Sequence, residues 1–203
     1  MNATDTIYRL DLNTEYTITV TALNGAAESE KITNKTFKTP DITVRLEAES
    51  VNPLSPMSIV NETTASGGKY IWWDNNNVLT AFTPTDPLAV YNYTIFKEGT
   101  YSIWLKTFSP NPDGDSYFAR IDGKDLSGGT GWTRVNLGPG TADPTNAVYG
   151  KWDWLPLNNA NWTSVFSKQF TVGTHTLEIC AREQRCKLDK IIIKEGVAKP
   201  TEN

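Results

Sequence analysis

Short runs of β-branched and aromatic residues alternate with clusters of Gly, Pro, Asn and Asp along the whole chain. Val, Ile, Thr, Tyr and Trp fit the pleated surface of a sheet, and the breaking residues end each run after a few positions. No segment carries apolar residues at the spacing of an amphipathic helix. The sequence therefore predicts an all-β protein.

A break at Thr39-Pro40-Asp41 divides the predicted strands into two groups. We place a domain boundary there, which gives segments 1–40 and 41–203. Three strands with one apolar face are marginal alone, so the first segment is expected to lean on the second, to pair with another chain or to be less ordered. Its expected strands are Thr6 to Leu10, Tyr16 to Leu23 and Ile32 to Lys38.

The second segment is long enough for one sandwich to bury about 70% of its unfolded surface. Its predicted strands have the spacing of a jelly roll, and those at Gly99 and Gly173 each follow a Gly turn as the second strand of a hairpin. Long loops are expected at 52–68 and 123–149, where they would shape specificity. The strands are Thr43 to Glu49, Lys69 to Trp73, Val90 to Phe96, Gly99 to Phe108, Ser116 to Ile121, Ser164 to Thr171, Thr174 to Cys180 and Lys187 to Lys194.

Charge and hydropathy exclude two classes of partner. The net charge is −4 and Lys and Arg do not cluster, so nucleic acid is not an expected partner. No apolar run approaches the roughly 18 residues of a membrane span, so membrane insertion is not expected.

The first residues lack the basic and apolar regions of a secretory signal, but the sequons indicate an extracellular or cell-surface location. They begin at Asn2, Asn34, Asn61, Asn92 and Asn161.

Aromatic residues gather in two groups beside the predicted strands. Tyr70 precedes Trp72-Trp73, and Trp152-Asp153-Trp154 stands in loop-like sequence. A pyranose stacks its apolar face on an indole or phenol and offers its hydroxyl edge to polar groups. Trp is also common in sandwich cores, so both core packing and sugar contact remain open for each ring. Neighbours on a strand point to opposite sides, so the pattern does not tell which Trp of a pair faces a ligand.

Cys180 and Cys186 flank a predicted hairpin tip centred on Glu183. Residues that face each other across an antiparallel pair can form a disulfide, and the alternative is two small buried thiols. A metal site there is not expected, because His175 is the only histidine and lies outside this segment.

Three cations, Arg182, Arg185 and Lys187, lie on the same predicted hairpin. Cations beside an aromatic surface suit a carboxylated or sulfated sugar. The alternative is a structural ion pair between Arg182 and Glu183 at the turn.

Catalysis is not expected. A glycosidase needs two carboxylates about 5 to 10 Å apart in a groove, and the candidates stand in no recognisable motif. His175 begins a predicted strand, where turn or edge packing is the expected role. The candidate carboxylates are Asp122, Asp125, Asp143 and Asp153.

A series of short motifs spans most of residues 44–194: Leu46-Glu-Ala-Glu49, Ser66-Gly-Gly-Lys-Tyr-Ile-Trp72, Glu98-Gly-Thr-Tyr-Ser-Ile-Trp104, Asp115-Ser-Tyr-Phe118, Ile121-Asp-Gly123, Trp152-Asp-Trp154, Val172 to Ile179, Arg182-Glu183 and Leu188-Asp-Lys-Ile191. In order and spacing they resemble family 6 and family 35 carbohydrate-binding modules. The resemblance implies a galactose-binding-like jelly-roll sandwich, working as a non-catalytic accessory domain of a larger polysaccharide-active or surface protein.

The first segment resembles the C-terminal part of a fibronectin type III domain. Leu12 stands four residues before Tyr16, as in the tyrosine corner of that family, where the phenol hydroxyl bonds to backbone upstream. This resemblance implies further domains in the parent chain.

The module resemblance implies a structural calcium ion where the first and last strands meet, with Glu47, Glu49 and Asp189 as ligands. Glu47 and Glu49 are two apart on a predicted strand and so project from one face, and Ca²⁺ prefers several oxygen ligands. The alternative is an ordinary charged strand face. Asp113-Gly-Asp115 is a candidate for a second oxygen-rich metal site. The alternative is a solvated turn.

The resemblance also implies a sugar cleft in loops at one end of the sandwich. Tyr70, Trp72 or Trp73 would stand on one side of it and Trp152 or Trp154 on the other. An Asn that the family has near the final strand is replaced here by Cys186-Lys187-Leu188. The sequence thus predicts a carbohydrate-binding module, and the alternative is a structural or adhesive domain without a sugar site. The predicted ligand-binding residues are Tyr70, Trp72, Trp73, Trp152, Trp154, Arg182 and Lys187.

Overall fold

The computed structural model contains two compact units, Met1–Ile42 and Thr43–Asn203. Among the residues that it describes there is no α-helix, only two short 3-10 turns at Ala48–Ser50 and Ser66–Gly68. None of these residues forms a helix that is long and apolar enough to cross a membrane. The described residues are 6–7, 10–11, 13–21, 23–24, 27–28, 33–39, 42–73, 88–137, 149–158 and 165–201.

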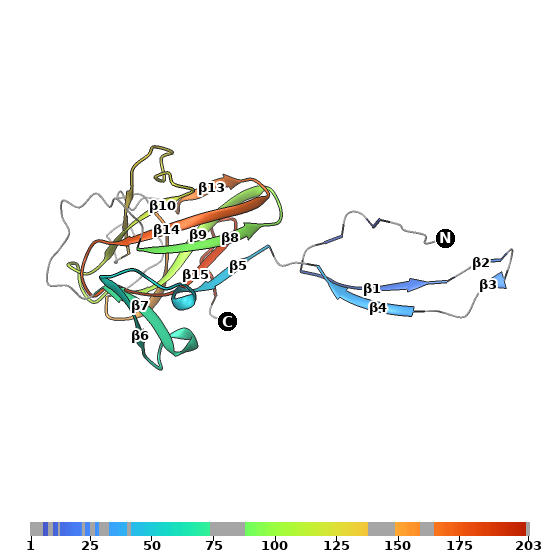
Figure 1. Ribbon diagram of the computed structural model, residues 1–203, viewed down its shortest axis with the longest axis horizontal. Coiled ribbons are helices and arrows are strands. Elements are labelled where there is room, and N and C mark those ends of the chain that lie inside the picture. Colours follow the sequence, from blue (N-terminus) through green and yellow to red (C-terminus); the bar gives the residue numbers. More distant parts are fainter. Residues whose placement is uncertain are drawn as a thin grey trace. The chain divides into compact units, whose positions relative to one another are not determined.

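The N-terminal unit is built on two antiparallel pairs (Figure 1). β1 (Glu15–Val20) pairs with β4 (Thr33–Lys38), and β2 (Leu23–Asn24) pairs with β3 (Ala27–Glu28). The predicted strand from Thr6 to Leu10 is wrong at its described positions 6, 7 and 10, which lie outside any strand.

Tyr16 ties β1 to the chain that precedes it. Its ring stacks on Phe37 with centroids 6.0 Å apart, and its hydroxyl accepts a hydrogen bond of 2.8 Å from the backbone N–H of Asp11. This is the upstream backbone bond that a tyrosine corner implies. Leu12, the other residue of that motif, lies outside the described residues, as do Asn2 and Asn161 of the sequons.

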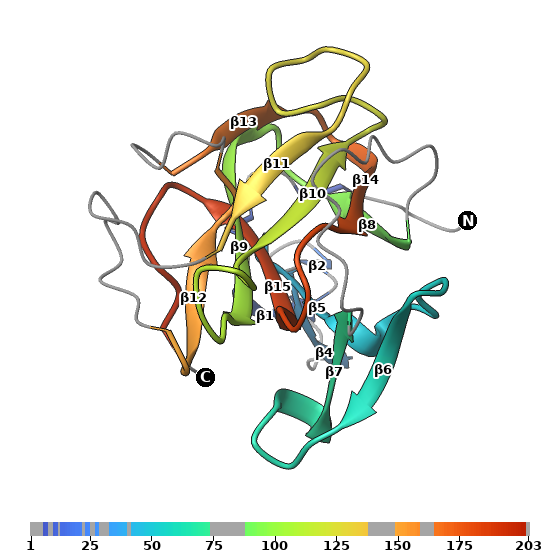
Figure 2. The same ribbon diagram turned by 90° about the vertical axis from the view of Figure 1, so that its left-hand side faces the viewer.

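The C-terminal unit is a sandwich of two antiparallel sheets (Figure 2). Its strands are β5 (Val44–Glu47), β6 (Met57–Asn61), β7 (Lys69–Trp73), β8 (Ala89–Ile95), β9 (Gly99–Phe108), β10 (Ser116–Ile121), β11 (Thr133–Asn136), β12 (Trp152–Pro156), β13 (Ser167–Phe170), β14 (Gly173–Ala181) and β15 (Lys187–Glu195). The smaller sheet has the order β11-β10-β14-β8. The larger has the order β12-β9-β15-β7-β6, with β13 on β9 and β5 on β15. The predicted all-β sandwich is confirmed.

The core lies between the two sheets and follows the alternation of the strands. On β8, Tyr91 and Ile95 point inward and are 1% exposed, while Val90 points outward. Burial of each large apolar side chain contributes roughly 1.5 to 3 kcal/mol. Two phenols of the smaller sheet also donate hydrogen bonds to backbone on the side of the larger one, Tyr91 to Ala48 O at 2.9 Å and Tyr117 to Cys186 O at 2.6 Å.

A β-bulge interrupts β15, the strand that pairs with β5, β7 and β9. Lys187 lies opposite Phe108 and Lys190 lies opposite Lys106, so Asp189 is an extra residue in the ladder. An extra residue reverses the inside-outside alternation beyond it. Lys187 and Lys190 therefore both point out of the sandwich although they are three positions apart.

The predicted hairpins at Gly99, Gly173 and Glu183 are wrong. In each case the chain crosses from one sheet to the other, because β8 and β14 belong to the smaller sheet whereas β9, β13 and β15 belong to the larger. Gly99 and Gly173 each begin a strand after a short connection, but the two strands joined by each connection pair with other strands.

The same crossing separates the two cysteines. Cys180 lies in β14 and Cys186 directly precedes β15, and both are buried free thiols. The disulfide alternative is therefore wrong, and the alternative of two buried thiols is confirmed.

Three strands lie where loops were expected. β6 and β11 fall within 52–68 and 123–149, and β12 contains Trp152 and Trp154. These strands are short and lie next to Gly, Pro and Asn, so their local sequence resembles that of a loop.

We predict that both thiols are unreactive in the folded protein. Burial raises the pKa of Cys180 and of Cys186 to about 12, so neither forms the reactive thiolate at pH 8. A thiol reagent should titrate both groups only after denaturation. A reducing agent should leave the free energy of unfolding unchanged, whereas loss of a disulfide would cost about 2 to 5 kcal/mol. A drop on reduction would contradict the assignment.

Candidate functional site

Three predicted ligand-binding residues and one phenylalanine form a row across the outer face of the larger sheet. Trp152 lies opposite Phe108, Phe108 lies opposite Lys187, and Lys187 lies opposite Trp72. Residues opposite each other on neighbouring strands share a face, so β12, β9, β15 and β7 present these side chains together. None of them belongs to the core between the sheets.

Tyr70 joins the row into one aromatic cluster, which we define as Tyr70, Trp72, Phe108 and Trp152. The Tyr70 ring lies 6.2 Å from Trp72 and 5.8 Å from Trp152, and Trp152 lies 5.7 Å from Phe108, all with edge-to-face tilts. Tyr70 is 4% exposed, while the other three rings are half-buried. The cluster therefore keeps part of both indoles in contact with solvent.

Lys187 lies over the aromatic cluster. Its ammonium is 4.7 Å from the Tyr70 ring centre, 4.8 Å from that of Phe108 and 5.8 Å from that of Trp152. The ring faces attract the cation, and Glu62 Oε2 binds it at 2.8 Å. The hydrogen bond from Lys187 lowers the pKa of Glu62, and a second bond from Thr64 lowers it further.

The edge of the aromatic cluster is polar. Trp152 Nε1 donates a hydrogen bond of 3.4 Å to Thr64 Oγ1, and the Glu62 carboxylate lies on the same loop. Apolar ring faces thus stand beside an ammonium, a carboxylate and a hydroxyl. Phe108, Glu62 and Thr64 were not among the predicted residues. The alternation of Lys106 and Phe108 in β9 is the sequence signal that could have identified Phe108 as outward-facing.

The structure brings together Tyr70, Trp72, Trp152 and Lys187 and separates the other predicted residues from them. Trp73, the neighbour of Trp72, points into the core and is 2% exposed. The rings of the cluster stand on strands β7, β9 and β12. The strand predicted over Lys69 to Trp73 is confirmed, and the expectation of loop structure at Trp152 is wrong.

Trp154 shares the outer face with Trp152 but is 4% exposed. It lines a pocket together with Pro200 and Thr201 of the C-terminal segment. Its indole is therefore a pocket wall and not an open platform.

Arg182 lies in a separate buried network. It pairs with Glu183 and donates to Ser116 Oγ at 2.5 Å. Glu183 Oε2 accepts from Ser116 Oγ at 2.6 Å, and Asp115 Oδ2 accepts from the Tyr149 hydroxyl at 2.8 Å. The geometry is that of the structural ion pair weighed for Arg182. Arg185, also on the predicted cationic hairpin, has a left-handed backbone with φ of 64°.

Burial dominates the electrostatics of this network. It raises the pKa of Asp115 to about 6, and the adjacent Glu183 carboxylate adds to the rise while the Tyr149 hydrogen bond opposes it. Asp115 is thus part of a buried network and not of an open oxygen-rich turn.

Glu47, Glu49 and Asp189 form a carboxylate group near the bulge of β15. Asp189 is fully buried, and its Oδ1 accepts from the backbone N–H of Ser66 at 2.9 Å. One oxygen of each carboxylate is buried without a hydrogen-bond partner: Glu47 Oε2, Glu49 Oε2 and Asp189 Oδ2. Buried unpaired oxygens of this kind are costly.

The three carboxylates repel one another. Burial raises the pKa of Asp189, and the Glu47 charge adds to the rise although Lys106 opposes it. Burial also raises the pKa of Glu49, with further increases from Glu47 and Asp189. Lys106 Nζ lies 3.5 Å from Asp189 Oδ2 and Lys190 Nζ lies 3.3 Å from Glu47 Oε1. In the described ranges no three His, Cys, Asp or Glu side chains are arranged to hold a metal ion as they stand.

The remaining candidate acids have structural partners. Asp122 accepts a 2.9 Å hydrogen bond from His175 Nδ1, Asp125 accepts from the backbone N–H of Gly129, and Asp153 pairs with Lys199. His175 Nε2 also bonds to a backbone carbonyl at 2.9 Å, in agreement with an edge-packing role. Asp143 lies outside the described residues.

No family model matches the sequence, and no curated protein matches it. Solved structures are similar to it. The C-terminal family 6 carbohydrate-binding module of a marine laminarinase from Zobellia galactanivorans is 16% identical, with 75% of this chain and 99% of that chain covered and a TM-score of 0.47. A family 35 carbohydrate-binding module from Clostridium thermocellum is 14% identical, with 74% and 97% covered and a TM-score of 0.45.

A third similar structure is a Bacillus thuringiensis Cry1Da tryptic core variant. It is 12% identical, with 77% of this chain covered and a TM-score of 0.50, and this chain spans 24% of that chain's length. At such identity the likeness concerns the fold alone.

We predict that Asp115→Asn stabilises the protein at neutral pH. The pKa of Asp115 is raised by folding to about 6 from 3.8, so folding favours the protonated acid. Its stabilising contribution is present below pH 3.8 and is lost as the pH rises through about 6. Urea unfolding at several pH values measures the free energy of unfolding of both proteins. Between pH 4 and 7, that of the wild type should decrease relative to that of the variant by on the order of 2 kcal/mol. A difference in free energy of unfolding that does not change with pH would show that ionisation of Asp115 does not destabilise the folded protein.

Proposed function

We propose that the C-terminal unit is a non-catalytic carbohydrate-binding module that binds a glycan on the aromatic cluster. The observation that carries this proposal is the row of Trp72, Lys187, Phe108 and Trp152 on the outer face of one sheet. It combines two half-buried indoles with hydrogen-bonding groups at their edge.

The chemistry of the row suits a sugar ring. The exposed part of an indole offers a flat apolar surface for pyranose C–H groups. Glu62 and Thr64 offer oxygen acceptors, and Lys187 offers a donor that the rings and Glu62 already hold in place. A site whose groups are fixed before binding loses little conformational entropy when the ligand arrives.

We predict that Trp72→Ala and Trp152→Ala each weaken glycan binding by at least about tenfold, because truncation of a central Trp removes its stacking surface. Trp fluorescence during titration with soluble glucans, xylans, mannans and galactans measures the affinity. Trp132→Ala is the matched control, since it removes a half-buried indole that stacks on Arg120 of the smaller sheet, 4.3 Å from the guanidinium carbon.

Melting temperatures of all three variants separate loss of binding from loss of folding. If no glycan changes the fluorescence, or if Trp132→Ala weakens binding as much as the other two, the aromatic cluster is packing only. The alternative of a structural or adhesive sandwich would then stand.

We also propose that Glu47, Glu49 and Asp189 hold a calcium ion. Carboxylate oxygens are the ligand type that Ca²⁺ prefers, and the mutual repulsion of the three carboxylates favours a cation between them. Glu47 Oε2 and Glu49 Oε2 are buried without a hydrogen-bond partner, and Asp189 Oδ2 has only the 3.5 Å ion pair with Lys106. The ion would draw the three carboxylates closer together and would take over part of the charge balance now supplied by Lys106 and Lys190.

We predict that saturating CaCl₂ raises the melting temperature by about 5 to 10 °C over the chelated protein, from the mass action of a ligand at about 100 times its Kd. Asp189→Asn should abolish this shift and should melt above wild type in chelator, because one repelling charge is gone. Asp113→Asn, at an exposed turn, is the matched control and should keep the shift. An equal calcium shift in Asp189→Asn would refute the site.

We propose further that Met1–Ile42 is the C-terminal part of a fibronectin type III domain and that the parent protein works outside the cell or at its surface. The Tyr16 to Asp11 hydrogen bond supports the first point, and the exposure of the sequon residues Asn61 and Asn92 supports the second. Labelling of the protein on unbroken cells tests the location.

A further inference from the structure

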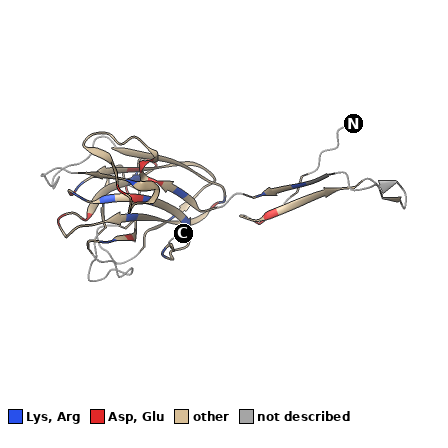
Figure 3. Cartoon of the chain, turned by 90° about the horizontal axis from the view of Figure 1, so that it is seen from below, with Lys and Arg blue, Asp and Glu red and all other residues tan. Residues whose placement is uncertain are grey.

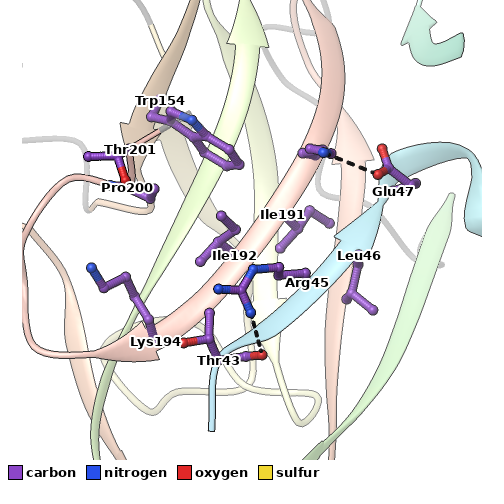
Figure 4. A pocket seen from close by; sticks show the side chains of 11 residues that line it. Thr43, Arg45, Leu46, Glu47, Trp154, Ile191, Ile192, Lys194, Pro200 and Thr201 are labelled. Atoms are coloured by element: carbon purple, nitrogen blue, oxygen red, sulfur yellow. Dashed lines mark hydrogen bonds and ion pairs between the residues drawn. The ribbon is translucent and has the colours of Figure 1, made fainter. Parts of the chain in front are cut away.

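A pocket of about 240 Å³ opens on the same outer face as the aromatic cluster. Figure 4 shows it between β5, β15 and the C-terminal segment, with Trp154, Pro200 and Thr201 at one end. The lining residues at its centre and rim that matter for binding are Arg45, Glu47, Trp154, Lys190, Ile192 and Lys194. The volume is below the roughly 300 Å³ of a drug-sized site, so it suits one small ring or the end of a longer molecule.

The pocket is held open by contacts of its own. The C-terminal segment folds back along the sheet, where the Gly196 carbonyl accepts from Ser102 Oγ at 2.5 Å and Lys199 pairs with Asp153 at 2.5 Å. Pro200 is buried by this fold-back. The wall opposite β5 therefore exists before any ligand arrives, which lowers the entropy cost of binding.

Positive charge exceeds negative charge in this pocket. Arg45, Lys190 and Lys194 line it against Glu47, in a chain whose net charge is −4. Lys190 pairs with Glu47 at 3.3 Å, and Arg45 donates to the carbonyl of Thr43 at 3.3 Å. The Lys194 ammonium has no ion pair with any residue that the structure describes. Elsewhere in the C-terminal unit, basic and acidic residues are interspersed (Figure 3).

The walls of the pocket supply apolar surface beside the cations. Ile192 and Pro200 contribute aliphatic surface. Trp154, which is 4% exposed, closes one end of the pocket with its indole ring (Figure 4).

We propose that this pocket binds the acidic group of a saccharide, a carboxylate or a sulfate, with Arg45 and Lys194 as the recognising cations and the sugar ring against Ile192 and Pro200. Guanidinium and ammonium groups form charge-assisted hydrogen bonds with such oxyanions. The pocket thereby gives the protein a preference for acidic glycans over neutral ones.

This inference deepens the proposed function and rests on it for the rest of the glycan chain. Arg45 lies opposite Ile192, which pairs with Trp104, and Lys194 pairs with Ser102, whereas Lys187 of the aromatic row pairs with Phe108. The recognising cations therefore lie four to six residues along β9 from the aromatic row. This separation spans about 13 to 20 Å, and one acidic polysaccharide can contact both sites.

The test is a titration of the full-length, isotope-labelled protein with glucuronic acid, glucose 6-sulfate, glucose, sodium acetate and sodium sulfate, followed by amide chemical shifts at constant pH. We expect saturable shifts at Arg45, Ile192 and Lys194 with the two acidic sugars. Glucose, acetate and inorganic sulfate should bind at least about tenfold more weakly, because each lacks either the charge or the ring. Raising NaCl from 50 to 500 mM should weaken acidic-sugar binding.

Arg45→Gln and Lys194→Gln should each lower the affinity for glucuronic acid about tenfold. Lys124→Gln, which removes an exposed charge in the turn after β10, should leave this affinity unchanged. Melting temperatures check the fold. Equal binding of glucose, equal binding of inorganic sulfate, or wild-type affinity in both pocket variants would overturn the proposal.

A double variant, Trp72→Ala with Trp152→Ala, separates the two proposals. It should keep the glucuronic acid shifts at Arg45 and Lys194 while losing polysaccharide binding. If wild type binds polysaccharide but shows no acidic-sugar shifts at the pocket, this inference fails and the proposed function stands. If wild type shows acidic-sugar shifts at the pocket but binds no polysaccharide, the proposed function fails and the pocket remains an acidic-sugar site.

Discussion

One extra residue in β15 determines which side chains of that strand lie on the outer face of the larger sheet. β15 contacts β5, β7 and β9, and the bulge at Asp189 lies between its two halves. Before the bulge, Lys187 points outward into the aromatic cluster; after it, Lys190 points outward again. A regular strand would have turned one of these lysines into the core, where an unpaired ammonium costs several kcal/mol.

The bulge also explains the carboxylate group. Asp189 is the residue that the ladder leaves unpaired, and it is fully buried where Ser66 and Lys106 approach it. Bulges re-aim side chains in this manner and are enriched beside functional sites. The aromatic cluster, the pocket and the carboxylate group therefore share one backbone irregularity, although different strands supply their other residues.

The tryptophans show how one residue type serves two purposes in a sandwich. Trp73 and Trp104 are 2% and 1% exposed and belong to packed regions, while Trp72 and Trp152 remain half-buried beside Lys187. The difference for Trp72 and Trp73 follows from strand geometry, because adjacent residues point to opposite faces. For Trp154 it follows from the C-terminal segment, which covers a ring that would otherwise stand on the open face.

Local pattern alone determined the strand class and several strands to the residue, among them β7, β9 and β10, because alternation and turn residues act over a few positions. Only the tertiary structure decided which strands pair, and so turned three apparent hairpins into crossings between sheets and kept Cys180 from Cys186. The same non-local pairing assembled Phe108 and Glu62 with the predicted Trp72 and Trp152, because strand partners are chosen by burial of whole faces and not by the residues next to a turn.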